Sequence, residues 1–458
     1  MNVIRQLPKL RLLGLAVCLA AGMFLTSATA SHQASGANAV TAWNANAGEA
    51  SIAACFIGGY GPQEARMYAM MHVAIHDALN GIDRRSHPYA ASLNAPGASP
   101  EAAVAAAARD VLVPTLGSLS FFLPAECISA GIASVEADYA AALAAIPARP
   151  AKTQGVAVGQ AAAAAILALR AADGYDTPLV DPDYHEGTAP GEYRYTPGTP
   201  FAFAPRLGED LTPFVLKDGS QFRPGPPYSL TSHEYAADVN EIQRLGGDDV
   251  VTPSDRTADQ TEIALFWVES SPLGWNRIAR TVADAEGIDL WESARLFGLL
   301  NMALTDGYVG TFETKYHYRF WRPVTAIRLA DIDGNPATTA DPTWTPLLEN
   351  PPIPDYDSGH AVEGGAAAQV LKRFFRTDKM GFSACSYTLP AGQMCSDASP
   401  TLRHFTSFSQ AADENAASRI YVGFHFRDAV ETGTRHGARI ADRAVNRFLR
   451  PAHEGARP

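Results

Sequence analysis

Apolar positions recur at helical spacing through the first part of the chain. Residues 62–82 form an amphipathic stretch, and three alanine-rich stretches follow at 99–112, 126–146 and 154–172. Apolar residues three to four positions apart are typical of a helix face that packs against a core, and Pro or Gly stands near the ends of these stretches. Because alanine has the highest helix propensity, these segments are predicted to be packed helices.

The helical pattern returns in the second half of the chain after an irregular interval. Residues 173–230 are rich in Gly, Pro, Tyr and Phe, and they are too long for a simple loop and too aromatic for a disordered segment. Further helices are expected at 232–245, 254–269, 275–286, 290–316, 361–374, 411–418 and 428–449.

The fold class predicted from these patterns is mainly α. Neither regular strand alternation nor a rhythm of alternating strands and helices occurs along the chain, which favours packed helical bundles. We expect one large α-helical domain over residues 31–458. It would contain an N-terminal bundle at about 45–175, an irregular wrap at about 176–230 and a C-terminal bundle at about 231–450.

The first thirty residues are typical of a secretory signal peptide. Three basic residues lie among the first eleven, an apolar run follows at 12–25, and small residues occupy the A-x-A positions Ala28 and Ala30. The alternative, a membrane anchor, is disfavoured because a spanning helix needs about 20 apolar residues. We therefore expect residues 1–30 to be cleaved, the mature protein to be periplasmic or extracellular, and no membrane span to remain.

Charge and cysteine content narrow the possible partners. Asp and Glu number 48 and Lys and Arg number 36, which gives a net charge of −12, so a nucleic acid partner is not expected. Cys55, Cys127, Cys385 and Cys395 follow the signal peptide, and an even number in an exported protein favours disulfides. A local Cys385–Cys395 bridge would leave Cys55 and Cys127 as the second pair. No C-x-x-C motif occurs, which argues against a zinc or dithiol redox site.

Three short segments of the last third carry candidate chemistry, and the first is cationic. Lys315 and Arg322 lie seven residues apart, so on a helix they share nearly one face. Pro323 limits any continuation of that helix. The two long side chains are able to converge on one anion, although a solvated basic face would have the same pattern.

The second segment is Ser358-Gly359-His360, which follows a Pro-rich stretch and begins a predicted helix. This turn offers a hydroxyl, a backbone N–H that glycine leaves accessible, and an imidazole. Helix N-termini favour anions. A plain capping turn is the alternative.

The third segment contains Arg419 and His425, which an ideal helix would place on different faces. Their convergence needs a break in the helix, and Gly423 is suited to provide one. Taken together, the three segments supply three cations and two imidazoles. Clustered cations are costly unless an anion neutralises them, so a tetrahedral oxyanion is the expected ligand.

The order and spacing of these segments resemble those of the vanadium-dependent haloperoxidases. That family shares the pattern K-x6-R-P, P-S-G-H and S-R-x5-H with the type 2 phosphatidic acid phosphatases and bacterial acid phosphatases. The chain has K-x6-R-P at 315–323, S-G-H at 358–360 and S-R-x5-H at 418–425, and its Phe-Trp-Arg-Pro sequence at 320–323 is similar to the haloperoxidase branch. The resemblance spans roughly residues 45–450. One departure is Asp357, which replaces the proline before Ser-Gly-His.

The resemblance implies a vanadate cofactor and a haloperoxidase reaction, in which hydrogen peroxide oxidises a halide to a hypohalous species. It implies a role for each residue of the pattern: His425 as the vanadium ligand, His360 as the acid–base group, Lys315 as the residue that polarises the peroxide oxygen, and Lys315, Arg322, Arg419, Ser358 and the Gly359 N–H as the groups that hold the vanadate oxygens. No haem or flavin is required.

Two alternatives remain open. The same pocket would serve an acid phosphatase that acts on a phosphate monoester, with His425 as a nucleophile that forms a phosphohistidine and His360 as the acid for the leaving group. An exported helical protein that binds an oxyanion without turnover is the other alternative, and Asp357 keeps it open. We expect its carboxylate either to weaken oxyanion binding or to raise the pKa of His360.

Other polar residues are given structural roles. His72 and His76 lie four residues apart among apolar neighbours, and we expect a hydrogen-bonded core pair and not a metal site. Asp306 lies nine residues before Lys315, where it would either orient an arginine of the site or form a plain ion pair.

Overall fold

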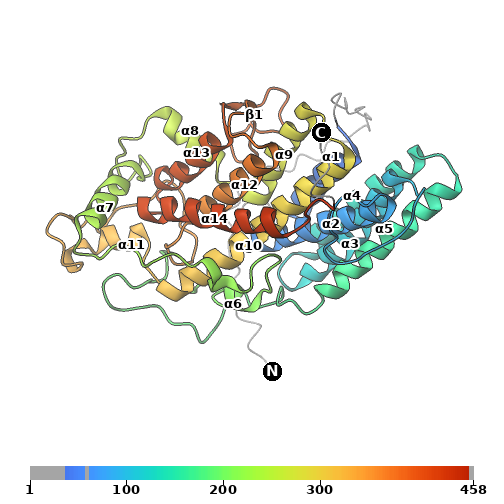
Figure 1. The fold of residues 1–458 in the computed structure, drawn as a ribbon. Helices are drawn as coiled ribbons and strands as arrows, with labels where there is room; N and C mark the ends of the chain where they lie inside the picture. The colour runs from blue at the N-terminus through green and yellow to red at the C-terminus, as the bar shows by residue number, and fades with distance from the viewer. Residues whose placement is uncertain (1–36, 57–60, 453–458) are drawn as a thin grey trace. The chain divides into compact units, whose positions relative to one another are not determined.

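Helices make up most of the molecule, as the apolar periodicity predicts (Figure 1). The computed structural model describes residues 37–56 and 61–452, so the predicted signal peptide at 1–30 lies outside the described residues. Helix accounts for 57% of the described residues and strand for 3%, which confirms the mainly α fold class. The described residues form one compact unit. The predicted boundaries between two bundles and a wrap stay a prediction.

The first five helices pack on one another. They are α1 (Ala39–Ala53), α2 (Gly61–Ile82), α3 (Pro100–Gly117), α4 (Ala125–Ala145) and α5 (Pro150–Leu169), and a short 3-10 helix, η1 (Ser118–Phe121), follows α3. Small residues set the distance between α3 and α5, since a Cβ at Gly159 would lie 2.3 Å from the carbonyl oxygen of Ala103. The alanine-rich sequence therefore produces close helix contact as well as helix propensity.

Both predicted cysteine pairs are bonded in the structure. Cys55, just after α1, is bonded to Cys127 in α4, and Cys385 is bonded to Cys395 across the Pro/Gly-containing loop. The first disulfide joins segments 72 residues apart.

The irregular segment contains only α6 (Leu207–Asp210) and η2 (Gly219–Phe222) as helices and lies against α10 (Leu290–Tyr318). Asp306 of α10 anchors it, because its carboxylate accepts hydrogen bonds from the backbone N–H groups of Phe214, Val215 and Leu216 at 2.6–2.7 Å. Burial raises the pKa of Asp306 to about 6, and these three N–H groups oppose the rise. The prediction that Asp306 orients an arginine of the site is therefore wrong.

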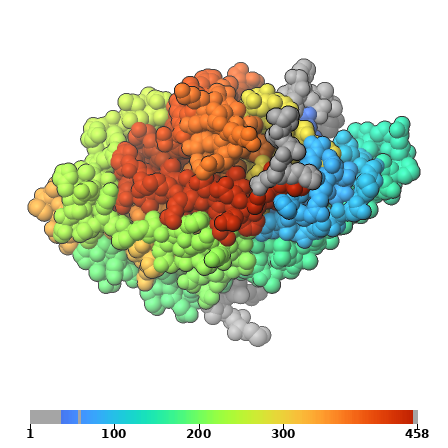
Figure 2. Space-filling view, in the orientation of Figure 1, coloured from blue at the N-terminus to red at the C-terminus, as the bar shows by residue number. Residues whose placement is uncertain are grey.

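The second half of the chain builds a group of helices around α10. It contains α7 (His233–Leu245), α8 (Ala258–Phe266), α9 (Ser271–Glu286), α11 (Pro323–Arg328), η3 (Ala330–Ile332), α12 (Gly359–Phe375), α13 (Phe408–Tyr421) and α14 (Arg427–Arg447). A two-stranded antiparallel pair, β1 (Phe382–Ala384) and β2 (Arg403–Phe405), was not predicted. Helix α10 also packs on α2. On the face in Figure 2, the end of the irregular segment (green) borders α14 (red).

Glycines bring α12 and α14 unusually close. A Cβ at Gly437 of α14 would lie 1.9 Å from the carbonyl oxygen of Val362, and one at Gly365 of α12 would lie 2.2 Å from that of Thr434. Close approach of the two backbones is possible only because these positions lack a side chain. The contact fixes the start of α12, where Ser358-Gly359-His360 lies, against the start of α14, which follows His425.

Two described helical segments, Pro100–Phe121 and Ala125–Ala145, are long and apolar enough to cross a membrane by length and composition alone. Alanine runs raise the mean hydropathy of these two segments, which are longer and more apolar than the sequence analysis recognised. In the structure 67% of the first apolar window is buried among neighbouring helices, and 17% of the second is buried.

Candidate oxyanion site

Lys315 lies in the last turn of α10 and is 1% exposed. Its Nζ donates hydrogen bonds to the carbonyl oxygens of Pro354 and Asp355, at 2.9 and 2.8 Å. Burial, followed by the charge of Arg322, lowers the pKa of Lys315 to about 7. The ammonium group is therefore tied to the loop that leads into Ser358-Gly359-His360.

Arg322 is the N-cap residue of α11 and is fully buried. Its Nε donates to the carbonyl oxygen of Ile353 at 2.6 Å, and its Nη1 donates to that of Phe424 at 2.8 Å. The same Nη1 lies 3.0 Å from Nε2 of His425. Its Nη2 is buried without a hydrogen-bond partner among the described residues. Burial lowers the pKa of Arg322.

Arg419 lies in the last turn of α13 and is 2% exposed. Its Nη1 donates to the carbonyl oxygen of Trp267 at 2.8 Å, and the guanidinium group lies over the ring of Phe424. Its Nε is buried and has no partner in the described part of the chain. Burial, and then the charge of Arg322, lowers the pKa of Arg419 to about 9.

A break after α13 brings His425 back to Arg419, as the sequence predicts. Gly423 has a φ of +83°, a conformation that glycine adopts readily. The backbone N–H groups of Phe424 and His425 both donate to the carbonyl oxygen of Arg419, at 3.0 and 3.2 Å. A Cβ at Gly423 would lie 2.6 Å from the carbonyl oxygen of Gly246, so the turn also requires glycine for space.

The two ring nitrogens of His425 have different surroundings. Nδ1 lies 2.8 Å from Oδ1 of Asp355, whereas Nε2 faces Arg322. A carboxylate beside Nδ1 favours the tautomer that leaves a lone pair on Nε2. Burial, and then the charges of Arg322, Lys315 and Arg419, holds the pKa of His425 well below its ordinary value. The imidazole is therefore neutral and able to act as a ligand or nucleophile through Nε2.

Ser358, Gly359 and His360 lie at the N-terminus of α12. Ser358 is the N-cap residue, but its hydroxyl does not cap the helix and is buried without a partner among the described residues. A Cβ at Gly359 would meet only a methyl group of Thr311, at 3.9 Å, so the space in front of this residue is open. The backbone N–H of Ser358 donates to Ala429 of α14 at 3.0 Å, which places the turn beside the helix that follows His425.

His360 is half-buried and contacts the loop that precedes α9. Its Nε2 lies 3.3 Å from the carbonyl oxygen of Glu269. Burial, and then the charge of Arg419, holds the pKa of His360 well below its ordinary value. The charged groups of Lys315, Arg322 and Arg419 lie near His425, and so does the imidazole of His360. The structure thus brings the predicted residues of all three segments together.

Asp357 faces away from this cluster. Its Oδ1 accepts a hydrogen bond from the hydroxyl of Thr311 at 2.7 Å, and its Oδ2 lies 2.9 Å from Nδ1 of His436 in α14. The expectation that its carboxylate raises the pKa of His360 is wrong, since burial and Arg419 lower that pKa. Asp357 links α10, α12 and α14 behind the turn.

Sequence reasoning assigned no role to Asp355 or His436. Asp355 lies in the Pro-rich stretch before the turn, five residues before His360, and it is buried. Its only signal in the sequence is the acidic residue at this position. The position of His436, three helical turns after His425, carries no signal that distinguishes it from other core residues.

His72 and His76 are hydrogen-bonded in the core. Nε2 of His72 lies 2.7 Å from the amide of Asn44, and His76 contacts Asp77 and Ser86 at 3.0 and 2.7 Å, which confirms the predicted core pair. Within residues 37–56 and 61–452, no cluster of three His, Cys, Asp or Glu residues is arranged to hold a metal ion.

Part of the chain matches a described domain family, and a curated relative matches about half of it. Residues 295–454 match the family described as the VCPO second helical-bundle domain. The vanadium chloroperoxidase of Curvularia inaequalis is 27% identical over 281 residues, which cover 49% of this chain and 45% of that protein. The chain therefore aligns with about half the length of that relative.

Solved structures share the fold over most of the chain. The first bacterial vanadium-dependent iodoperoxidase matches with a TM-score of 0.72 and 24% identity, over 91% of this chain and 98% of that one. A bacterial vanadium-dependent chloroperoxidase in its holo form matches with a TM-score of 0.63 and 18% identity, over 84% and 92%. The chain has the vanadium haloperoxidase fold, and its predicted relationship to that family is confirmed.

Proposed function

We propose that this protein is a vanadate-dependent haloperoxidase that uses hydrogen peroxide to oxidise a halide to a hypohalous species. The observation that carries the proposal is a set of buried polar atoms without partners among the described residues: Nη2 of Arg322, Nε of Arg419 and Oγ of Ser358. Buried donors are normally satisfied, and three buried cations are costly without a counter-charge. A tetrahedral oxyanion would meet both requirements.

The residues fit vanadate. His425 would bind the metal through Nε2, while Lys315, Arg322 and Arg419 would balance the charge, and Ser358 with the Gly359 N–H would donate to its oxygens. When bound, vanadate supplies a Lewis-acid centre that activates peroxide.

The chain's own groups then have separate tasks. His360 is neutral because burial and Arg419 lower its pKa, so its imidazole accepts a proton from incoming peroxide. Lys315, held by two carbonyl oxygens, would donate a hydrogen bond to the reacting oxygen, and the protonated His360 would return its proton as the halide is oxidised. The burial of the three cations excludes water and strengthens these interactions.

An acid phosphatase is the second candidate, and one contact favours it. Asp355 lies 2.8 Å from Nδ1 of His425, which is the arrangement that activates Nε2 as a nucleophile toward a phosphate monoester. The non-catalytic alternative depended on a carboxylate in the pocket, and Asp357 instead faces Thr311 and His436.

One preparation distinguishes these activities. Vanadate-loaded protein is expected to oxidise bromide or iodide with hydrogen peroxide in a dye-halogenation assay, and vanadate-free protein is expected to leave p-nitrophenyl phosphate intact. Phosphate hydrolysis without halide oxidation would establish the phosphatase instead. We also propose that the protein is exported, which N-terminal sequencing of the mature chain tests directly.

His425→Ala is expected to weaken vanadate binding by roughly two orders of magnitude, in line with the ~2–5 kcal/mol typical of truncating one member of a buried charged contact. The matched control is His317→Ala, which removes an exposed imidazole two residues after Lys315. Wild-type vanadate affinity in the His425 variant, measured by calorimetry, would rule out His425 as the ligand.

A further inference from the structure

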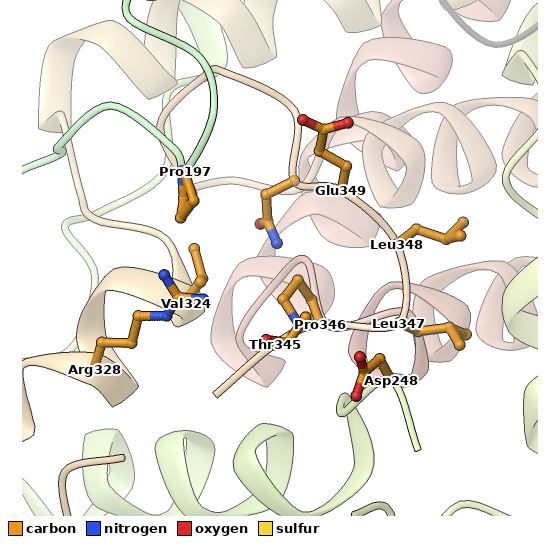
Figure 3. A pocket seen from close by; sticks show the side chains of 10 residues that line it. Pro197, Asp248, Val324, Arg328, Thr345, Pro346, Leu347, Leu348 and Glu349 are labelled. Carbon is orange, nitrogen blue, oxygen red and sulfur yellow. The ribbon is translucent and has the colours of Figure 1, made fainter. Parts of the chain in front are cut away.

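A cavity of about 320 Å³ lies between α11 and the segment 345–350 (Figure 3). It is formed by α11, the segment 345–350, Pro197 of the irregular segment and Asp248 of the loop after α7. Its volume is at the lower end of the range for pockets that hold small organic molecules. No residue of this cavity belongs to the oxyanion site described above.

The cavity has apolar and polar walls. Its apolar lining comes from Pro197, Val324 and Pro346, whereas the side chains of Leu347 and Leu348 project away from Arg328 (Figure 3). The polar wall contains Arg328, whose Nε donates to the carbonyl oxygen of Trp344 at 2.9 Å. Within the described residues, no carboxylate lies within 4.0 Å of its guanidinium group. In a chain with a net charge of −12, an arginine left without an acidic partner in a pocket is suited to an incoming anion.

Asn350 provides a second, independent polar contact. It lines the same cavity, is 4% exposed, and its Oδ1 is buried without a partner in the described part of the chain. Its Nδ2 is held weakly by the carbonyl oxygen of Gly423 at 3.4 Å. A ligand O–H or N–H would satisfy Oδ1, which otherwise carries a desolvation cost of about 1–3 kcal/mol.

The two carboxylates of the rim do not compete for the guanidinium group. Oδ1 of Asp248 accepts hydrogen bonds from the backbone N–H groups of residues 250–252. Glu349 is exposed to solvent. Both leave the face of Arg328 to a bound molecule.

The cavity is built on the same chain segments as the oxyanion site. Val324 lies two residues after Arg322 in α11, and Gly423, which Asn350 contacts, lies two residues before His425. Pro346 packs directly on Gly423, since a Cβ there would lie 2.7 Å from that of Pro346. A molecule in the cavity therefore lies next to the segments that carry two of the anion-binding residues.

We propose that this cavity binds the organic acceptor of the reaction, an aromatic carboxylate that carries a hydroxyl group. Arg328 would hold the carboxylate, Oδ1 of Asn350 would accept a hydrogen bond from the hydroxyl group, and the ring would lie on Val324 and Pro346. This acceptor role rests on the proposed haloperoxidase function. In the transfer, the hypohalous acid gives its halogen to a ring carbon: a carbon–halogen bond forms, the halogen–oxygen and carbon–hydrogen bonds break, and the oxygen leaves with the ring proton as water.

The test is direct binding of 4-hydroxybenzoate to the full chain without vanadate, measured by calorimetry. Arg328→Gln is expected to weaken binding at least tenfold, whereas Arg244→Gln, which removes an arginine paired with Asp255 on the surface, is expected to leave it unchanged. Pro197→Trp, which places a large ring in the cavity and keeps the guanidinium group (Figure 3), is expected to abolish binding. Absence of binding to wild type, or equal binding to all three variants, would overturn the proposal.

A second probe separates the carboxylate contact from general affinity for phenols. 4-Hydroxybenzamide lacks the charge, so its binding is expected to be weaker in wild type and nearly insensitive to Arg328→Gln. Because these measurements need neither vanadate nor peroxide, binding without halide oxidation would uphold the cavity as a ligand site and overturn the haloperoxidase function. Halide oxidation without binding would do the reverse.

Discussion

Asp355 and Asp357 show how two nearby aspartates acquire opposite tasks. Both are fully buried, and they lie on either side of Tyr356 in the same loop. Asp355 contacts Nδ1 of His425, while Asp357 contacts Thr311 and His436. One carboxylate therefore acts on the ligand histidine from within the site, and the other holds the turn from behind.

Asp355→Asn is expected to weaken vanadate and phosphate binding roughly 10–100-fold, the usual effect of losing a carboxylate that orients a metal-binding histidine. The amide has the same size but cannot balance the charges of Lys315 and Arg322. Affinity is measured by calorimetry on the vanadate-free protein, with Asp331→Asn, an exposed aspartate, as the control. Unchanged affinity for both anions would show that the contact with His425 is incidental.

At the scale of single residues, the sequence predicts well which residues form the site and poorly the direction in which each side chain points. The spacing of cations and imidazoles was sufficient to nominate Lys315, Arg322, Arg419 and His425. An oxyanion ligand would neutralise the clustered cations, and a break at Gly423 allows Arg419 and His425 to meet. The direction of Asp357 depends on where Thr311 and His436 lie. That information is tertiary, and no local pattern contains it.

Among the elements, the crossing of α12 and α14 positions the site. Three glycines lie in this contact, and Gly433 approaches the carbonyl oxygen of Ser358 itself, since a Cβ there would lie 2.8 Å away. The two helices were predicted from periodicity, but their contact was not, because a helical pattern shows which face is apolar and not which helix covers it. The same limit explains the missed strands β1 and β2, which are three residues each.

Gly437→Ala is expected to destabilise the protein by about 1–3 kcal/mol, the typical cost of overpacking, and to weaken oxyanion binding as the start of α12 moves. The control is Gly117→Ala at the end of α3, where a Cβ would meet nothing within 4 Å. That substitution is expected to be neutral or slightly stabilising. Denaturant unfolding gives both free energies. Equal stability of the two variants would contradict the close contact.

Over the whole molecule, the buried cations couple anion binding to folding and to pH. Burial and Arg322 lower the pKa of Lys315 from 10.5 to about 7, whereas the unfolded chain keeps this lysine protonated to about pH 10. Between these values the folded, anion-free protein binds one proton fewer than the unfolded chain. Stability therefore increases with pH across this window as far as Lys315 is concerned, and it is lowest below pH 7, where the charged form is buried.

A bound dianion offsets the cost of burying protonated Lys315, because its negative charge returns the pKa of Lys315 toward the ordinary value. Sulfate is a suitable probe, since it is a tetrahedral dianion whose charge is constant from pH 6 to 9. Above pH 7 its binding must take up a proton, so its dissociation constant is expected to rise by up to about tenfold per pH unit. The increase in Tm that sulfate produces should accordingly be largest at pH 6 and smallest at pH 9.

Lys315→Met removes the titrating group, so the pH dependence of the sulfate effect is expected to flatten, although the affinity itself falls. Lys217→Met, which removes an exposed lysine, is expected to keep the wild-type slope. Sulfate also stabilises proteins by exclusion from their surface, but that effect is common to all three proteins and cancels in the comparison. If wild type and Lys315→Met showed the same slope, Lys315 would not be the group that links the anion to the fold.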